Sequence, residues 1–143
     1  RVSNSRNIDK ISWSYLYNHE DIEDVFQDTL MIVYENINGL KNVNYFETWY
    51  VSILLNECRK KLKIRNRELP KENIECQEYY MDEYNFFQEI NSIDEIYKEV
   101  IVLKYVSGYT QEGISKILNI PIGTVKSRIY RGLQELRKLL EEV

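Results

Sequence analysis

Apolar residues recur along most of this chain with a spacing close to 3.6 residues, and few stretches alternate with a period of two. The first spacing is that of an amphipathic α-helix, whereas the second marks a half-buried strand. The pattern therefore predicts an all-α fold. The expected helices occupy residues 8–17, 21–37, 45–63, 83–92, 94–107, 110–118 and 121–141.

The periodicity is interrupted over one long stretch, RNRELPKENIECQEYYMDEYN, which contains Pro70. Polar segments with a proline commonly connect domains. The sequence predicts two small helical domains, at 1–64 and 82–143, joined by a linker at 65–81.

The net charge of −4 is unevenly distributed. Residues 64–96 contain 3 basic and 9 acidic side chains, whereas residues 97–143 contain 8 basic and 5 acidic ones. The linker region is therefore acidic and the C-terminal segment is basic. Because charge acts locally, an acidic chain of this kind can still have nucleic acid as a partner.

Patterns typical of catalytic and metal sites do not occur in the sequence. Cys58, Cys76 and His19 lack the spacing of a zinc site, and the chain has neither an HExxH motif nor a glycine-rich phosphate loop. We therefore expect no catalytic activity, no metal and no cofactor. No apolar run is long enough to span a membrane, and the chain begins with neither an initiator Met nor an apolar signal stretch, as a fragment would.

Two predicted helices near the C-terminus are separated by a short turn. Thr110 can cap the first helix, Asn119 tolerates the left-handed conformation of a tight turn, and Pro121 suits the first position of the second helix. The second helix has an apolar stripe, formed by Val125, Ile129, Leu133, Leu136 and Leu140. This arrangement is that of a helix-turn-helix.

The other face of the second helix is polar and basic, with Ser127, Tyr130, Arg131 and Gln134 flanked by Lys126 and Arg128. A face of this kind suits the DNA major groove, where Arg and Lys bond to guanine edges. It is also the pattern of a solvated basic helix, and spacing alone leaves both interpretations open.

The predicted helix at 21–37 carries an apolar face, formed by Ile22, Val25, Phe26, Leu30 and Val33. The opposite face gathers Asp24, Gln27, Asp28, Met31 and Glu35. Acidic residues in a first turn favour the helix dipole, which is one explanation. Gln27 and Met31 within an acidic stripe also suit docking onto a basic, partly apolar partner.

The predicted helix at 45–63 carries a core face, formed by Val51, Leu54, Leu55, Cys58 and Leu62. The other side gathers Trp49, Ser52, Asn56, Arg59, Lys60 and Lys63. Cations beside an aromatic ring and an Asn suit an opened DNA strand, because cations follow phosphates and rings stack on bases. The alternatives are a Trp49 packed inside the domain and a solvated RKKLK helix end.

Four segments resemble one family. VLKYVSGYTQEGISKIL and IPIGTVKSRIYRG are similar to region 4 of sigma-70-type transcription initiation factors. DIEDVFQDTLMIVYENI and FETWYVSILLNECRKKL are similar to regions 2.2 to 2.4 of the extracytoplasmic-function, or group IV, sigma factors. The resemblance implies two helical domains, binding to core RNA polymerase, recognition of the −10 and −35 promoter elements, and control by an anti-sigma factor.

The resemblance also implies roles for single residues. Positions expected to read the −35 element are Lys126, Ser127, Tyr130 and Arg131, with Thr124 and Arg128 on phosphates. Positions expected at the −10 element are Trp49, Ser52, Asn56, Arg59, Lys60 and Lys63, with the loop 36–45 capturing an extruded base. Positions expected at core polymerase are Asp24, Gln27, Asp28, Met31 and Glu35.

The chain departs from the family pattern at three places. Gly113 stands where an acidic residue is usual, which breaks the capping box begun at Thr110 and costs the helix about 1 kcal/mol relative to Ala. Asn119 stands where Gly is common in the turn. The first helix of region 2 is shorter than in the family.

Three functional interpretations follow. The favoured one is a sigma factor in the bacterial cytoplasm, held at the membrane only through an anti-sigma factor. The second is a helix-turn-helix regulator that binds duplex DNA without polymerase, and the third is a sigma-like protein that only captures an anti-sigma factor. The acidic linker either threads the nucleic-acid channel of the polymerase or serves as a solvated tether.

Overall fold

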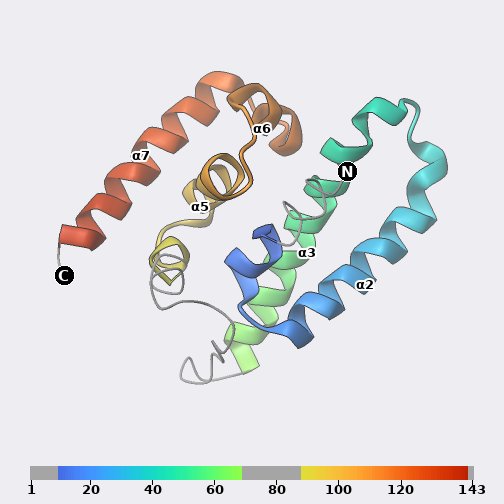
Figure 1. Ribbon diagram of the computed structural model, residues 1–143, viewed down its shortest axis with the longest axis horizontal. Coiled ribbons are helices and arrows are strands. Elements are labelled where there is room, and N and C mark those ends of the chain that lie inside the picture. Colours follow the sequence, from blue (N-terminus) through green and yellow to red (C-terminus); the bar gives the residue numbers. More distant parts are fainter. Residues whose placement is uncertain (1–9, 69–87, 142–143) are drawn as a thin grey trace. The chain divides into compact units, whose positions relative to one another are not determined.

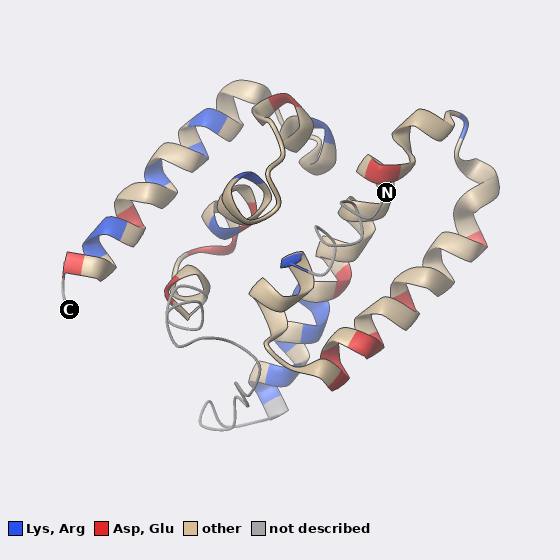
Figure 2. Ribbon diagram, in the orientation of Figure 1, with Lys and Arg blue, Asp and Glu red and all other residues tan. Residues whose placement is uncertain are grey.

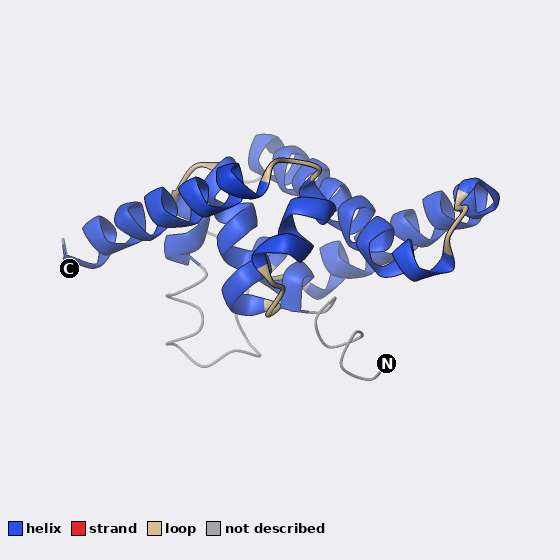
Figure 3. Cartoon of the chain, turned by 90° about the horizontal axis from the view of Figure 1, so that it is seen from above, coloured by secondary structure: helices blue, strands red, loops and turns tan. Residues whose placement is uncertain are grey.

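The computed structural model describes residues 10–68 and 88–141, and all regular structure in these two ranges is helical (Figures 1 and 3). The all-α prediction is confirmed. Contacts divide the chain into an N-terminal unit, Arg1–Glu75, and a C-terminal unit, Cys76–Val143. Most of the predicted linker lies outside the described residues, so its boundaries and its two possible roles stay predictions.

The N-terminal unit begins with helical residues 10–16, followed by α2 (His19–Asn36). Between them, Tyr17 adopts a left-handed conformation with φ 54°. Asn18 caps α2, because its Oδ1 accepts hydrogen bonds from the backbone N–H of Glu20 at 2.8 Å and of Asp21 at 3.2 Å. This cap starts α2 earlier than the apolar pattern predicted.

Two short 3₁₀ segments, η1 (Ile37–Gly39) and η2 (Val43–Tyr45), connect α2 to α3 (Phe46–Glu68). Asn42 caps η2 by accepting a hydrogen bond from the backbone N–H of Asn44 at 3.0 Å. The Asn36 side chain donates to the carbonyl of Ile32 at 2.8 Å, at the end of α2. Helix α3 continues past residue 63, where the pattern predicted its end.

The core of the N-terminal unit lies between helical residues 10–16, α2 and α3. Its fully buried residues include Ile11, Tyr15, Leu16, Val25, Val51, Leu54, Leu55 and Cys58. The predicted core face of α3 is confirmed at four of its five positions, and Leu62 is half-buried.

The prediction that Leu30 belongs to the buried face of α2 is wrong. Leu30 is 56% exposed, and the neighbouring Thr29 is buried in its place. The buried positions of α2 are Ile22, Val25, Thr29 and Val33, a narrow stripe with steps of three and four residues. Because successive residues of a helix differ by about 100°, a single narrow stripe cannot also contain Leu30. Phe26 is half-buried at its edge.

The C-terminal unit contains helical residues 88–92, α5 (Glu95–Ile101), the π-helix η3 (Val102–Val106), α6 (Gln111–Leu118) and α7 (Ile122–Glu141). The sequence predicted one α-helix at 94–107. Its second half instead has π-helical bonding, in which the N–H of Ser107 donates to the carbonyl of Val102 at 3.0 Å. Gly108 follows at φ 79°, which ends the helix.

The turn between α6 and α7 confirms two local predictions. Thr110 Oγ1 accepts a hydrogen bond from the N–H of Gly113 at 3.0 Å, and Asn119 has φ 56°. Pro121 lies one residue before α7, not inside it as predicted. Its carbonyl accepts hydrogen bonds from Thr124 at 3.0 Å and Val125 at 3.1 Å, so it begins the hydrogen-bonding pattern of the helix.

Helix α7 packs on α5 closely at Gly132. A Cβ atom at this glycine would lie 2.5 Å from Ile101 Cδ1 and 3.2 Å from Tyr97 Cβ. The buried positions of α7 are Val125, Ile129, Gly132 and Leu136. The predicted stripe was therefore wrong at Leu133 and Leu140, which are 41% and 64% exposed, because the close approach at Gly132 turns the helix away from them.

Candidate nucleic-acid and polymerase interfaces

The outer face of α7 carries most of the residues expected at the −35 element. Lys126, Ser127 and Arg131 are exposed, and Tyr130 is 66% exposed. Basic residues recur along this helix (Figure 2). Helix α6 packs against α7, and the left-handed turn at Asn119 sets the angle between the two. The arrangement presents hydrogen-bonding side chains outward from a rigid helix.

Two residues assigned to phosphates lie deeper in the C-terminal unit. Thr124 is half-buried. Arg128 is also half-buried, and its Nη1 lies 3.6 Å from Oε1 of Glu99 on α5. The Glu99 side chain is 10% exposed. Sequence periodicity gave no sign of this pair, because Glu99 lies on another helix.

The six −10 positions fall on one side of α3, at different depths. Asn56, Lys60 and Lys63 are exposed. Trp49, Ser52 and Arg59 are half-buried. The Phe46 ring lies edge-on to Trp49 at a centroid distance of 6.0 Å. This contact limits the orientations open to the indole ring while leaving part of it accessible.

Two of these side chains are engaged within α3. The Ser52 hydroxyl donates to the carbonyl of Trp49 at 2.7 Å, so its oxygen lone pairs remain available while its proton is used. Lys60 Nζ lies 3.2 Å from Oε2 of the buried Glu57. Lys60 is exposed despite this pair, so its ammonium can reach a phosphate.

An open hollow of about 650 Å³ lies beside Trp49. It is lined by the end of α2, by the loop that includes Leu40, Asn42 and Tyr45, and by the start of α3. An aromatic ring, apolar side chains and amide groups therefore surround a space at the edge of the basic side of α3. This hollow falls within the loop that the resemblance assigned to base capture.

The outer face of α2 is more apolar than the sequence indicated. Gln27, Asp28 and Glu35 are exposed, and Met31 is 61% exposed, as expected. Three further apolar side chains join them: Leu30 at 56%, Tyr34 at 82% and Ile37 at 41%. These residues line a shallow groove together with Met31. We call Leu30, Met31, Tyr34 and Ile37 the α2 apolar patch.

A sequence signal for this patch exists. Residues 30–34 read LMIVY, five apolar residues in succession. A helix packed on one side can bury only about half of such a run. The remaining side chains must face outward, and the exposed ones here are Leu30, Met31 and Tyr34.

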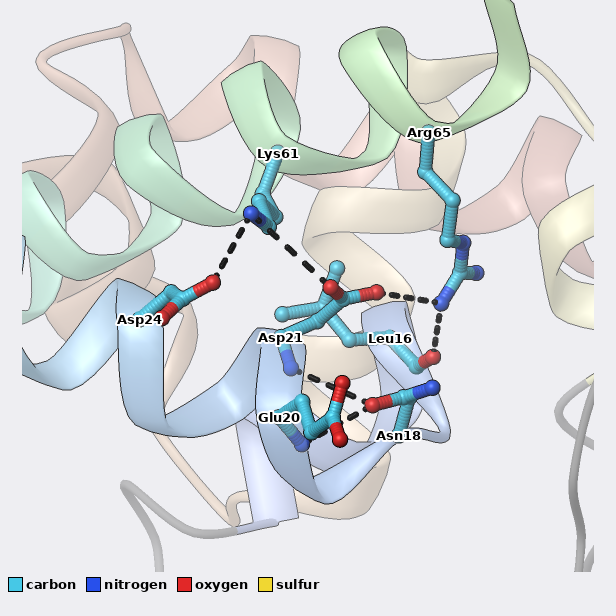
Figure 4. Close-up of polar contacts among 7 residues, drawn as sticks. All are labelled: Leu16, Asn18, Glu20, Asp21, Asp24, Lys61 and Arg65. Atoms are coloured by element: carbon cyan, nitrogen blue, oxygen red, sulfur yellow. Dashed lines mark hydrogen bonds and ion pairs between the residues drawn. The ribbon is translucent and has the colours of Figure 1, made fainter. Parts of the chain in front are cut away.

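The acidic start of α2 is tied to α3 by ion pairs (Figure 4). Lys61 Nζ lies 3.0 Å from Asp24 Oδ2 and 3.8 Å from Asp21 Oδ1, and Arg65 Nη1 lies 3.2 Å from Asp21 Oδ2. The Arg65 guanidinium also donates to the backbone carbonyl of Leu16. Asp24, expected at the polymerase, therefore also holds α2 and α3 together.

The hydrogen bond to Asp24 raises the pKa of Lys61 above its ordinary value of 10.5, and the nearby charges of Asp24, Asp21 and Asp28 act in the same direction. Partial burial acts against this increase. The ammonium form is thus favoured in the folded protein. Lys61 therefore serves as a fixed positive charge at neutral pH.

Within the described ranges, no group of His, Cys, Asp and Glu side chains is placed to hold a metal ion. Among those same residues, no helix has the length and apolar character needed to cross a bilayer. Cys58 is buried in the core of the N-terminal unit.

The comparisons with known proteins agree with the geometry of both units. The family model described as Sigma-70 region 2 matches residues 2–68, and that described as Sigma-70, region 4 matches residues 85–136. This chain belongs to the sigma-70 family. The ECF RNA polymerase sigma factor SigW of Bacillus subtilis is 29% identical, over 94% of this chain and 83% of that protein. The group is therefore that of the extracytoplasmic-function sigma factors, whose members are initiation factors and not enzymes.

Two further similarities extend over both regions. The ECF RNA polymerase sigma-E factor of Haemophilus influenzae is 26% identical, over 85% of this chain and 75% of that protein. The solved structure of the sigma factor RpoE from Bartonella quintana, in complex with the anti-sigma factor NepR, matches with a TM-score of 0.75 and 26% identity. That match covers 98% of this chain and 92% of the RpoE chain. The chain thus functions as an RNA polymerase sigma factor.

Proposed function

We propose that regions 2 and 4 of this sigma factor divide promoter recognition between two chemically different surfaces. In region 4, Lys126, Ser127, Tyr130 and Arg131 of α7 read the −35 element as a duplex. In region 2, α3 and the hollow beside Trp49 hold the −10 element as an opened strand. The α2 apolar patch and its acidic neighbours dock onto core polymerase.

The observation that carries this proposal is the hollow beside Trp49, on the helix that carries the exposed Asn56, Lys60 and Lys63 further along. A base in a duplex is stacked and cannot enter a side pocket, whereas an unstacked base can lie against an aromatic ring. Trp49 and Tyr45 provide rings, and Asn42 provides an amide. Asn56, Lys60 and Lys63 lie exposed on α3. A regulator that binds only duplex DNA has no use for such a combination.

The −35 surface has the opposite character. Its polar side chains project outward from one helix, and such a helix fits the major groove. Arg131 is suited to bond two acceptors of one guanine, and Lys126 is suited to a phosphate or a base edge. Thr124, at the start of α7, lies where backbone N–H groups favour a phosphate.

Docking onto the polymerase requires a partner surface that is apolar and positively charged. The α2 apolar patch supplies side chains of the kind that form the centre of an interface, and Asp28 and Glu35 supply a charged rim. The similar sigma factor RpoE of Bartonella quintana was crystallised in complex with the anti-sigma factor NepR. We expect an anti-sigma factor to hold this chain as well, in the bacterial cytoplasm or at the membrane.

The proposal is tested by run-off transcription and permanganate footprinting with purified core polymerase and promoters from the source genome. The wild-type holoenzyme should open a promoter and make its −10 thymines reactive. Asn56→Ala should retain polymerase binding and −35 binding but open promoters less well, most strongly for one −10 base.

The matched control for Asn56→Ala is Asn66→Ala, an exposed Asn near the end of the same helix. If the wild-type chain opens no promoter but binds duplex DNA tightly without polymerase, the chain acts as a regulator. If it binds an anti-sigma factor and neither opens promoters nor binds DNA, it acts only as a decoy. If Asn56→Ala opens every −10 variant as well as wild type, another residue reads that base.

A further inference from the structure

The charge of Arg128 is already partly balanced within the protein. Its guanidinium lies 3.6 Å from a Glu99 carboxylate that is 10% exposed, while the Arg128 side chain is itself 27% exposed. Opposite charges at this separation and depth are screened less than a pair in water. A phosphate near α7 therefore meets a weaker positive charge at Arg128 than at a solvated arginine.

The other cations on the DNA side of α7 are placed differently. Lys126 and Arg131 are exposed, and no described carboxylate lies within ion-pair distance of either. Arg128 thus differs from its neighbours in both depth and pairing. The three cations that the sequence places close together are not equivalent.

The ion pair is not what seats α7 on α5. The helix is held at Gly132, where a Cβ would lie 2.5 Å from Ile101 Cδ1, and by the buried Val125, Ile129 and Leu136. Replacing Glu99 by the similarly shaped Gln should therefore leave the helix in position. The substitution removes the carboxylate charge beside Arg128 and keeps the size of the side chain.

We propose that Glu99 is a positioning residue of region 4, which holds the Arg128 guanidinium against α5 and so keeps one positive charge off the DNA phosphates. Phosphate contacts add affinity for every sequence and carry no sequence information. Restraining Arg128 thus lowers the affinity of α7 for all DNA sequences by a similar factor and leaves discrimination to the exposed side chains of the helix. This inference rests on the proposed −35 role of α7.

The test measures binding of the full chain to duplex DNA by fluorescence anisotropy across a range of salt concentrations. Two probes are compared: the −35 duplex most enriched by the wild-type chain from a randomised pool, and the unselected pool itself. Each phosphate contact contributes about 0.9 to the slope of log affinity against log salt. Glu99→Gln should steepen this slope by about 0.9 on both probes.

The selectivity between the two probes should not change. Because Arg128 would gain a phosphate contact on any sequence, Glu99→Gln should bind both probes about threefold to tenfold more tightly at low salt, and the ratio of the affinities for selected and unselected DNA should stay the same. Adding Arg128→Gln to Glu99→Gln should remove the gain. A merely structural role for Glu99 would lower affinity and leave the slope unchanged.

Two results would overturn the inference. One is an unchanged slope in a Glu99→Gln protein whose circular dichroism matches wild type. The other is an Arg128→Gln protein whose slope of log affinity against log salt falls as far as the slope of Lys126→Gln, because Arg128 would then already bind phosphate in the wild-type chain. This second comparison replaces the first if Glu99→Gln does not fold. If the wild-type chain enriches no −35 sequence, with or without core polymerase, the proposed function itself fails.

Discussion

Lys61 and Asp24 join the two main helices of region 2, with Nζ and Oδ2 3.0 Å apart. Asp24 belongs to the acidic stripe expected at the polymerase, and Lys61 lies between Lys60 and Lys63, two of the −10 cations of α3. The pair therefore borders both surfaces. Charge changes at Asp24 therefore act on the fold as well as on any partner. The remaining acidic residues of the stripe allow these effects to be separated.

The first prediction concerns the stability of region 2. Lys61→Met should lower the free energy of unfolding by about 0.2–1 kcal/mol near neutral pH, a modest value because Asp24 is 55% exposed. Both tryptophans lie in the N-terminal unit, so urea unfolding followed by tryptophan fluorescence reports on this unit. Lys63→Met, at an exposed lysine of the same helix, is the control and should change little.

The pH dependence of that difference follows from the raised pKa of Lys61. A group whose pKa is higher in the folded state than in the unfolded state stabilises the fold fully when the pH is below its unfolded-state pKa. This stabilisation is lost as the pH rises through the folded-state pKa. The difference between wild type and Lys61→Met should thus be constant between about pH 6 and pH 10.5, where the aspartates are ionised, and shrink at higher pH. A difference that instead vanishes on acidification to pH 6 would assign the effect to another group.

The second prediction concerns docking onto core polymerase. Tyr34→Ser should weaken binding by about tenfold or more, since buried aromatic residues are frequent hot spots of interfaces. Asp28→Lys should weaken binding chiefly at low salt, as expected for a charged rim. Ile64→Ser, which removes an exposed apolar side chain from α3, is the matched control. Equal affinities for all three variants would place the docking surface elsewhere.

The third prediction separates base recognition from phosphate attraction on α7. Arg131→Ala should lose about 1–3 kcal/mol of discrimination at one −35 base pair. Lys126→Gln should weaken binding to all sequences and reduce the salt slope by about 0.9 if it contacts phosphate. Affinities for a set of single-base −35 variants check this. Parallel losses on every variant would show that Arg131 is not a base reader.

The fourth prediction compares two glycines of α7. Gly132→Ala should destabilise region 4, because its Cβ would meet Ile101 and Tyr97 in a filled interface, and overpacking typically costs about 1–3 kcal/mol. Part of that loss is offset by the gain in helix propensity, about 1 kcal/mol. A Cβ atom at Gly123 would have no neighbouring atom within 4 Å. Gly123→Ala should therefore stabilise α7 by up to about 1 kcal/mol through helix propensity. Hydrogen exchange of the α7 amides distinguishes the two; equal protection would contradict the close packing at Gly132.

Local features of this protein could be predicted from sequence, and long-range ones could not. The cap at Thr110 and the left-handed Asn119 depend on neighbouring residues, so their residue types are informative. Leu30 and Leu133 were assigned to the core because an apolar position does not show which neighbour will cover it. The width of the buried stripe depends on the partner helix.

The candidate surfaces follow the same division. The exposed positions of α7 and α3 could be identified from helical spacing, because the opposite face was clearly apolar. The pairings of Glu99 with Arg128 and of Lys61 with Asp24 join separate helices, and no local pattern indicates them. In each pair an acidic side chain partly neutralises a basic one. The positive charge that DNA can contact is therefore smaller than the count of Lys and Arg residues in the sequence suggests.

Arg65 has a practical consequence for work on region 2 by itself. Its guanidinium joins the end of helical residues 10–16, through the Leu16 carbonyl, to Asp21 at the start of α2. A recombinant fragment that stops at residue 64 would contain every expected −10 side chain and yet lack this cross-link. Helical residues 10–16 would then be held mainly by the packing of their buried side chains. Protease digestion should therefore cleave this N-terminal segment faster than in a fragment that includes Arg65. Fragments that extend through Glu68 retain the complete helix α3.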